Sequence, residues 1–98
     1  MRRPALATSD DLESFLREHP AWRYDGTRLV LEATPSYVSA CGLAAASVPL
    51  AEEIDHHPIL TIGYNQLRVE LWTHDQGGVT SLDFAMASFI DDFLRTRP

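Results

Sequence analysis

The chain has 98 residues, of which 45% are hydrophobic and 22% charged, a composition typical of one small globular domain with a modest core. Its net charge of −6 and the lack of a basic stripe argue against nucleic acid as a ligand. The sequence has no apolar run long enough for a membrane span and no signal-peptide h-region, and its single cysteine excludes an internal disulfide. A cytoplasmic protein is therefore expected.

The N-terminal quarter predicts an arm, a short helix and a hairpin. Residues 1–7 are expected to form a flexible arm. A hydroxyl cap with acids in the first turn, Thr8-Ser9-Asp10-Asp11, predicts a helix that ends at His19-Pro20, with His19 interpreted as a surface residue. Asp25-Gly26 is a hairpin signal, which predicts a strand on either side of it, at residues 21–24 and 28–32.

A long helix is predicted to follow, from Thr34-Pro35 to about His56. Its buried stripe is expected to contain Tyr37, Cys41, Ala44, Val48 and Ala51. On this interpretation Cys41 is a small core residue rather than a nucleophile. Pro49 cannot donate a hydrogen bond to the residue four positions back, so a kink, or two helices that meet near Ser47, is predicted.

Alternating side chains predict a second hairpin, with strands at residues 59–64 and 67–73. Thr80 and Asp83 resemble a capping box for a last helix, whose apolar face contains Leu82, Ala85, Met86, Phe89, Ile90 and Phe93. The order α-β-β-α-β-β-α predicts an α+β fold with a four-stranded antiparallel sheet and helices packed on one face. A strand edge and four further apolar residues favour self-association, unless these residues fill the subunit's own core: Ile59, Leu60, Ile62 and Phe84.

The most distinctive stretch is Glu52-Glu53-Ile54-Asp55-His56-His57-Pro58. The final proline disfavours the α region for His57, so the two imidazoles should leave the chain in different directions. Glu52 and His56 are four residues apart and would share a helix face. His74 follows the second hairpin, which returns the chain toward the pair. Three converging histidines are typical of proton transfer near neutral pH, although histidines at a helix end can also simply cap it.

The motifs of the second half occur in a specific order. They are Glu52-x-x-x-His56-His57-Pro58, Tyr64-Asn65, Thr73-His74, Gly78-Val79-Thr80-x-x-Asp83 and Ala87-Ser88-Phe89-Ile90. Over about residues 50–92 this set closely resembles the pterin-4a-carbinolamine dehydratase family. The resemblance implies a homodimer or homotetramer that converts 4a-hydroxytetrahydropterin to quinonoid dihydropterin, without metal or organic cofactor. Such a reaction helps to recycle the cofactor of aromatic amino acid hydroxylases.

The same resemblance implies roles for particular residues. The family's active-site histidines match His56, His57 and His74. Its glutamate matches Glu52 and its helix-capping aspartate matches Asp83, and the further supporting residues of the candidate site are Asp55, Pro58, Trp22 and Thr73. Loss of water needs an acid at the leaving hydroxyl and a base at a ring nitrogen. We expect His56 and His74 to be this pair, in either assignment, and His57 mainly to hold the pterin.

Two other functions are compatible with the same residues. One is a non-catalytic protein-binding module on this fold, such as a coactivator or an assembly chaperone, which would not require all three histidines. The other is a zinc site formed by Glu52, His56 and His74.

Overall fold

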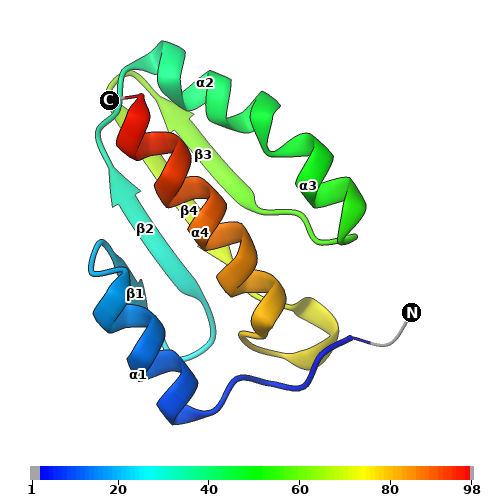
Figure 1. Cartoon of the computed structure of the whole chain (residues 1–98). Helices are drawn as coiled ribbons and strands as arrows, with labels where there is room; N and C mark the ends of the chain where they lie inside the picture. Colours follow the sequence, from blue (N-terminus) through cyan, green and yellow to red (C-terminus); the bar gives the residue numbers. More distant parts are fainter. Residues whose placement is uncertain (1–2, 98) are drawn as a thin grey trace.

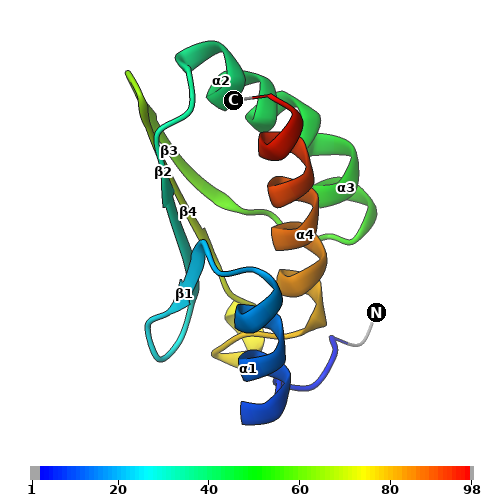
Figure 2. The same ribbon diagram turned by 60° about the vertical axis from the view of Figure 1, so that its left-hand side comes forward.

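A computed structural model describes residues 3–97 of the chain. In chain order its elements are α1 (Ser9–Glu18), β1 (Trp22–Tyr24), β2 (Leu29–Ala33), α2 (Tyr37–Ala46), α3 (Val48–Glu53), β3 (Ile59–Gly63), β4 (Gln66–Leu71), the short 3₁₀ helix η1 (His74–Gln76) and α4 (Ser81–Thr96). The strands form one antiparallel sheet in the order β1-β2-β4-β3. The helices α1 to α4 all cover one face of this sheet (Figure 1, Figure 2). The predicted α+β fold is therefore confirmed, with the long helix divided in two.

The sheet separates an apolar face from a charged face. The side chains that point toward the helices form the core together with α4: Leu29 and Leu31 from β2, Leu67, Val69 and Leu71 from β4, and Met86, Ala87 and Ile90 from α4. Burial of aliphatic side chains of this size is worth about 1.5–3 kcal/mol each. On the other face Glu32 accepts hydrogen bonds from Arg23 and Arg68 at 2.5 and 2.7 Å. The hydrogen bond from Arg23 holds the pKa of Glu32 below its usual range.

The N-terminal helix begins at the hydroxyl cap that the sequence predicts, and the structure shows that Asp11 completes a capping box. The Thr8 hydroxyl accepts from the Asp11 N–H at 3.1 Å, and the Asp11 carboxylate accepts from the Thr8 N–H at 3.0 Å, which lowers the pKa of Asp11. Of the expected flexible arm, residues 1 and 2 lie outside the described part of the chain. The Ala7 N–H donates to the Val79 carbonyl at 2.8 Å, so the arm runs beside the segment that enters α4.

The predicted break near Ser47 is confirmed. Ser47 ends α2 and begins α3, and its hydroxyl donates to the Ala44 carbonyl at 2.9 Å. Pro49 lies in the first turn of α3, where the N–H that proline lacks has no helical partner in any case. The second of the two helices, α3, leads into the segment that carries His56, whose Nε2 lies 2.5 Å from Oδ1 of Asp83 in the first turn of α4.

The prediction for the buried stripe of the long helix was right at Ala51 and wrong at three other positions. The residues that are buried are Ala40, Leu43, Ser47 and Ala51, whereas Tyr37, Cys41 and Val48 are exposed. The cause is that α2 (Tyr37–Ala46) has apolar residues around its whole circumference, so the hydrophobic pattern does not distinguish one side from the other. Cys41 is consequently an exposed free thiol and not a core residue. No helix in the described part of the chain is long and apolar enough to cross a membrane.

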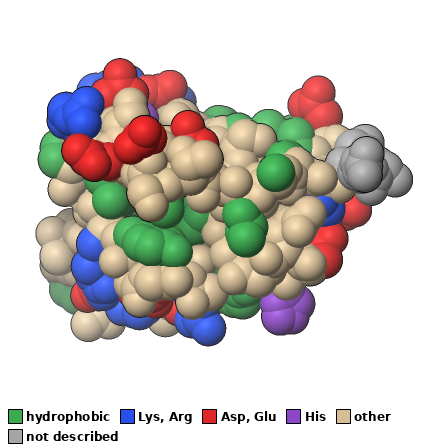
Figure 3. Space-filling model, turned by 90° about the horizontal axis from the view of Figure 1, so that it is seen from below, with side chains coloured by type: hydrophobic (Ala, Val, Ile, Leu, Met, Phe, Trp, Pro, Cys, Tyr) green, Lys and Arg blue, Asp and Glu red, His purple; other side chains and the backbone are tan. Residues whose placement is uncertain are grey.

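Charge is distributed without a single dominant sign on the face seen from below, where acidic and basic side chains lie among hydrophobic ones (Figure 3). Several charged side chains of the molecule form ion pairs. Arg28 Nη1 lies 2.8 Å from Glu70 Oε1, and Arg95 pairs with Asp92 within α4. His19, expected to be a surface residue and not a site residue, is partly exposed; its Nδ1 lies 2.7 Å from Asp91 Oδ2 and its ring stacks on Phe15.

Candidate active site

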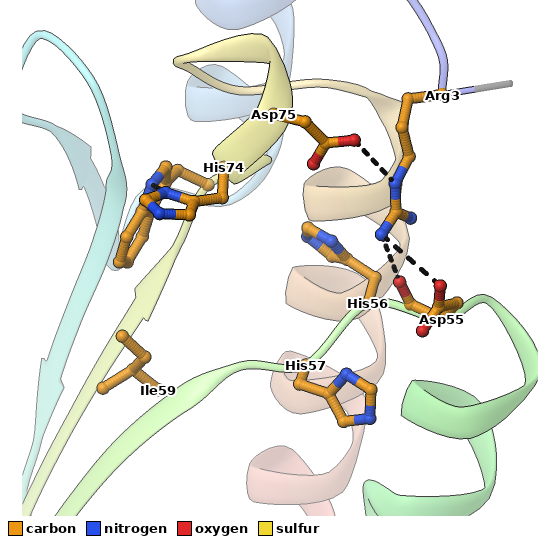
Figure 4. A pocket seen from close by; sticks show the side chains of 8 residues that line it. Arg3, Asp55, His56, His57, Ile59, His74 and Asp75 are labelled. Atoms are coloured by element: carbon orange, nitrogen blue, oxygen red, sulfur yellow. Dashed lines mark hydrogen bonds and ion pairs between the residues drawn. The ribbon is translucent and has the colours of Figure 1, made fainter.

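The three histidines of the sequence motifs line one cavity of about 300 Å³. Its lining residues are Arg3, Asp55, His56, His57, Ile59, Trp72, His74 and Asp75. His56 and His57 belong to the connection between α3 and β3, and His74 begins η1, directly after β4. Because β3 and β4 pair along their whole length, the hairpin returns His74 to the neighbourhood of the other two. Figure 4 shows His56 pointing into the space between His74 and Arg3, with His57 turned toward α3.

His56 forms the floor of the cavity with a buried aspartate. Its side chain is only 6% exposed, and its Nε2 lies 2.5 Å from Oδ1 of Asp83, which is fully buried. The other oxygen of Asp83 accepts from the Thr73 hydroxyl and from the Thr80 N–H, both at 2.9 Å. The proton between Asp83 and His56 therefore lies on the Oδ1–Nε2 line. Nδ1 is the ring nitrogen that is left for a molecule in the cavity.

Two threonines complete this buried network. Thr73 Oγ1 lies 2.7 Å from Thr80 Oγ1, and because Thr73 donates to Asp83, the Thr80 hydroxyl donates to Thr73. Thr80 Oγ1 in turn accepts from the Leu82 N–H at 3.2 Å. Asp83 is thus both the third residue of the α4 capping box and the partner of His56. Every buried polar side-chain atom in residues 3–97 has a hydrogen-bond partner, as a fixed network requires.

The end of α3 differs from the prediction that Glu52 and His56 share a helix face. The helix ends at Glu53, and Asp55 adopts a left-handed conformation with φ of 49°. The His56 N–H then donates to the Ala51 carbonyl at 2.9 Å, which is the long bond of a Schellman motif. This turn directs His56 toward Asp83 instead. Glu52 pairs with His57 and not with His56.

His57 and Glu52 form a second histidine–carboxylate pair, at the surface. His57 Nε2 lies 2.6 Å from Glu52 Oε2, and the two side chains are 56% and 69% exposed. His57 lies outside helix and strand, directly before Pro58 and β3, and the proline disfavours a helical backbone there. His57 also lines a neighbouring hollow, together with Glu52, Pro58 and side chains of α2, α3 and β3. Glu52 and Pro58 therefore lie beside the main cavity and not in it.

His74 is fixed by an aromatic neighbour that the sequence interpretation missed. The Trp72 Nε1–H donates to Nδ1 of His74 at 3.3 Å, with the two rings edge to face. An indole N–H can only donate, so Nδ1 of His74 is unprotonated and Nε2 carries the proton. The guanidinium of Arg28 lies 4.4 Å from the centroid of the Trp72 ring and pairs with Glu70. The sequence signal that could have identified Trp72 as a site residue is its position on the outward face of a predicted strand, two residues before His74.

The remaining candidate residues lie at different depths. Thr73 and Asp83 are beneath His56, whereas Asp55 lines the cavity. Trp22 is a core residue, and its Nε1 donates to Asp91 Oδ1 at 2.9 Å, away from the cavity. Arg3 is a lining residue that nothing in the sequence connected with the histidines.

The residues of the alternative zinc site are held apart by their partners. Within residues 3–97 there is no group of three or more histidine, cysteine or acidic side chains placed to hold a metal ion. Glu52 bonds to His57, and the Nε2 of His56 is occupied by Asp83. The proposed ligand set of Glu52, His56 and His74 is therefore not assembled.

Comparison with known proteins shows the family of this chain. Residues 5–93 match the family described as pterin 4 alpha carbinolamine dehydratase. The chain belongs to this family. All the residues of the buried network and the cavity except Arg3 lie inside the matched range.

Individual relatives in the dehydratase family cover nearly the whole chain. A protein of Prochlorococcus marinus is 32% identical over 93 residues, which are 94% of this chain and 98% of the relative. One of Natronomonas pharaonis is 40% identical over 86 residues, 87% and 91% of the two chains. Both carry the name "Putative pterin-4-alpha-carbinolamine dehydratase". A crystal structure from Brucella melitensis, described as a transcriptional coactivator/pterin dehydratase, has a TM-score of 0.80 at 31% identity and covers 90% of this chain and 97% of its own.

Proposed function

We propose that this chain dehydrates 4a-hydroxytetrahydropterin (pterin-4a-carbinolamine) to quinonoid dihydropterin. The observation that carries the proposal is one cavity with two imidazoles whose available ring nitrogens differ: Nδ1 of His56 and the Nε2–H of His74. Family membership supports the same substrate class. We place the reaction in the cytoplasm, as a step that regenerates tetrahydropterin for aromatic amino acid hydroxylases.

The two imidazoles suit the two halves of the reaction. The Nε2–H of His74 donates a proton to the hydroxyl on C4a as the C–O bond breaks and water leaves. Nδ1 of His56 accepts the proton of the adjacent ring nitrogen, and the N–H electron pair forms the new C=N bond. One proton is given and one is taken, so no oxidant or covalent nucleophile is needed. The Asp83 carboxylate stabilises the imidazolium that forms on His56.

The other candidate residues support this pair in the proposed mechanism. His57 is exposed at the rim and holds the pterin, and Glu52 orients it. Thr73 fixes Asp83. Three residues act through the backbone or the core: Asp55 by its left-handed turn, Pro58 by disfavouring a helical backbone at His57, and Trp22 by packing from β1 into the core.

A dehydration assay on the purified full chain with freshly generated 4a-hydroxytetrahydropterin tests the proposal. Saturable turnover above the uncatalysed rate is expected. Replacing either His56 or His74 with Ala should lower kcat about 10²–10⁴-fold, because each removes one proton-transfer group. His19→Ala is the matched control, since His19 also pairs with a carboxylate but lies outside the cavity. Turnover no faster than the uncatalysed reaction would contradict the proposal.

Self-association remains a proposal, on grounds that differ from those in the sequence. Three of the four apolar residues that favoured it, Leu60, Ile62 and Phe84, pack against the subunit's own core. What supports it now is the outer side of α2, where Val38 is 82% exposed, and the unpaired edge of β3. Sedimentation equilibrium should give a multiple of 11.0 kDa. A single 11.0 kDa species would contradict self-association and leave the exposed side of α2 for the second candidate function, binding of another protein.

A further inference from the structure

Arg3 reaches the cavity although it precedes all of the secondary structure. The arm that carries it is held by the Ala7–Val79 hydrogen bond, and by Leu6, which lies so close to Gly78 that a Cβ there would be 3.0 Å from Leu6 Cδ2. These contacts direct the arm along the segment between β4 and α4. The Arg3 side chain is accordingly only 24% exposed, in contrast to the arginines on the helix surfaces.

The guanidinium of Arg3 connects two walls of the cavity. Its Nη2 donates to the Asp55 carbonyl at 2.6 Å, and its Nη1 donates to the Ile54 carbonyl at 3.4 Å. These carbonyls follow the last turn of α3, where a helix leaves its acceptors without partners. On the opposite wall, Nε lies 3.4 Å from Asp75 Oδ2. Figure 4 shows the side chain between Asp55 and Asp75.

Two of these attachment points, Asp55 and Asp75, are next to a histidine of the proposed reaction. Asp55 precedes His56 and holds the left-handed conformation that directs it to Asp83. A residue with a side chain adopts this conformation at a cost, so a hydrogen bond to its own carbonyl stabilises the turn where strain is concentrated. Asp75 directly follows His74. Arg3 thus bonds to residues next to both histidines from outside their segments, in addition to the buried link that Asp83 makes between His56 and Thr73.

We propose that Arg3 is a positioning residue for the dehydration: it holds the turn at residues 54–57 and the 3₁₀ helix η1 at the separation that the two proton transfers need. The inference rests on the proposed function. Arg3 contacts neither reacting histidine, so its effect reaches kcat through their placement. A displacement of about 1 Å in such a site can cost up to about 100-fold in rate.

The test uses the full chain with Arg3→Ala and Arg3→Lys, and with Arg17→Ala as a matched control on the exposed side of α1. We expect Arg3→Ala to lower kcat by about 10-fold or more while KM changes less. Arg3→Lys should recover only part of this loss, because an ammonium group cannot reproduce the planar fork that reaches both walls. In hydrogen exchange, the amides of His56 and Gly77 should exchange at least about fivefold faster in Arg3→Ala, and that of Leu12 in α1 should not change.

The outcomes separate this inference from the proposed function. A wild-type chain without turnover overturns the proposed function, and this inference with it. A wild-type chain that turns over, beside an Arg3→Ala variant with the same kcat, overturns the positioning role alone. Loss of kcat accompanied by faster exchange throughout the chain, Leu12 included, also overturns it, because Arg3 would then stabilise the fold in general. Loss of kcat with exchange confined to the two cavity walls supports it.

Discussion

His56 and His57 are adjacent in the chain, yet they occupy opposite environments. His56 is buried against Asp83, whose remaining oxygen is held by Thr73 and Thr80, whereas His57 meets Glu52 in solvent. The first pair cannot rearrange without leaving a buried polar group unpaired, and the second can exchange its partner for water at little cost. The floor of the cavity therefore has a fixed proton arrangement, and its rim has an adaptable contact.

The largest effect should come from breaking the floor with Asp83→Asn. The amide keeps the size of the carboxylate, but if its oxygen serves Thr73 and Thr80, its NH₂ faces Nε2 of His56. His56 must then move its proton to Nδ1, and it loses the base that the reaction uses. We expect kcat to fall about 10²–10³-fold and the free energy of unfolding to fall by about 1–3 kcal/mol. Steady-state kinetics and ¹⁵N spectra of the imidazole test this, and an unchanged His56 tautomer would contradict it.

An intermediate effect is expected from Trp72→Phe. The substitution removes the donor to His74 Nδ1 but keeps an aromatic ring beside Arg28. His74 is then free to place its proton on either nitrogen, so a smaller fraction of the protein presents the Nε2–H. The loss in kcat should be about 3–10-fold, the equivalent of one neutral hydrogen bond. If kcat and the imidazole spectrum both match those of the wild type, the role assigned to Trp72 is wrong.

The smallest effect should come from Glu52→Gln. This substitution removes the negative charge of the exposed Glu52–His57 pair, as Asp83→Asn removes that of the buried Asp83–His56 pair. Both partners are more than half exposed, so the pair is screened by water. We expect KM to change by no more than about 5-fold, with kcat and thermal stability close to those of the wild type. A loss of kcat as large as that in Asp83→Asn would show that the two pairs do not differ as described.

Sequence predicted those parts of the fold whose causes are local. The helix starts at Thr8 and Thr80 depend on residues within three positions of the cap, and the break at Ser47 depends on Pro49 alone. The alternation in β4 identified its buried side chains because each points to one face of the sheet. These features need no knowledge of distant segments.

The features that sequence missed depend on contacts across the fold. The partner of His56 is 27 residues away, and the left-handed Asp55 changed which histidine Glu52 meets. The face of α2 was mispredicted because its sequence is apolar on every side. Arg3 lies 52 residues from Asp55, in a stretch without periodicity. For the candidate site, motif order therefore located the histidines but not the carboxylate that each one uses.

The most direct test of the contrast between floor and rim is a parallel determination of kcat and KM for His56→Ala and His57→Ala. Because His56 transfers a proton in the proposed reaction, its replacement should lower kcat about 10²–10⁴-fold with little change in KM. His57 holds the pterin, so its replacement should raise KM and leave kcat within about 3-fold of the wild type. The reverse ranking, with kcat lost in His57→Ala and retained in His56→Ala, would contradict the assignment of the chemistry to the buried histidine.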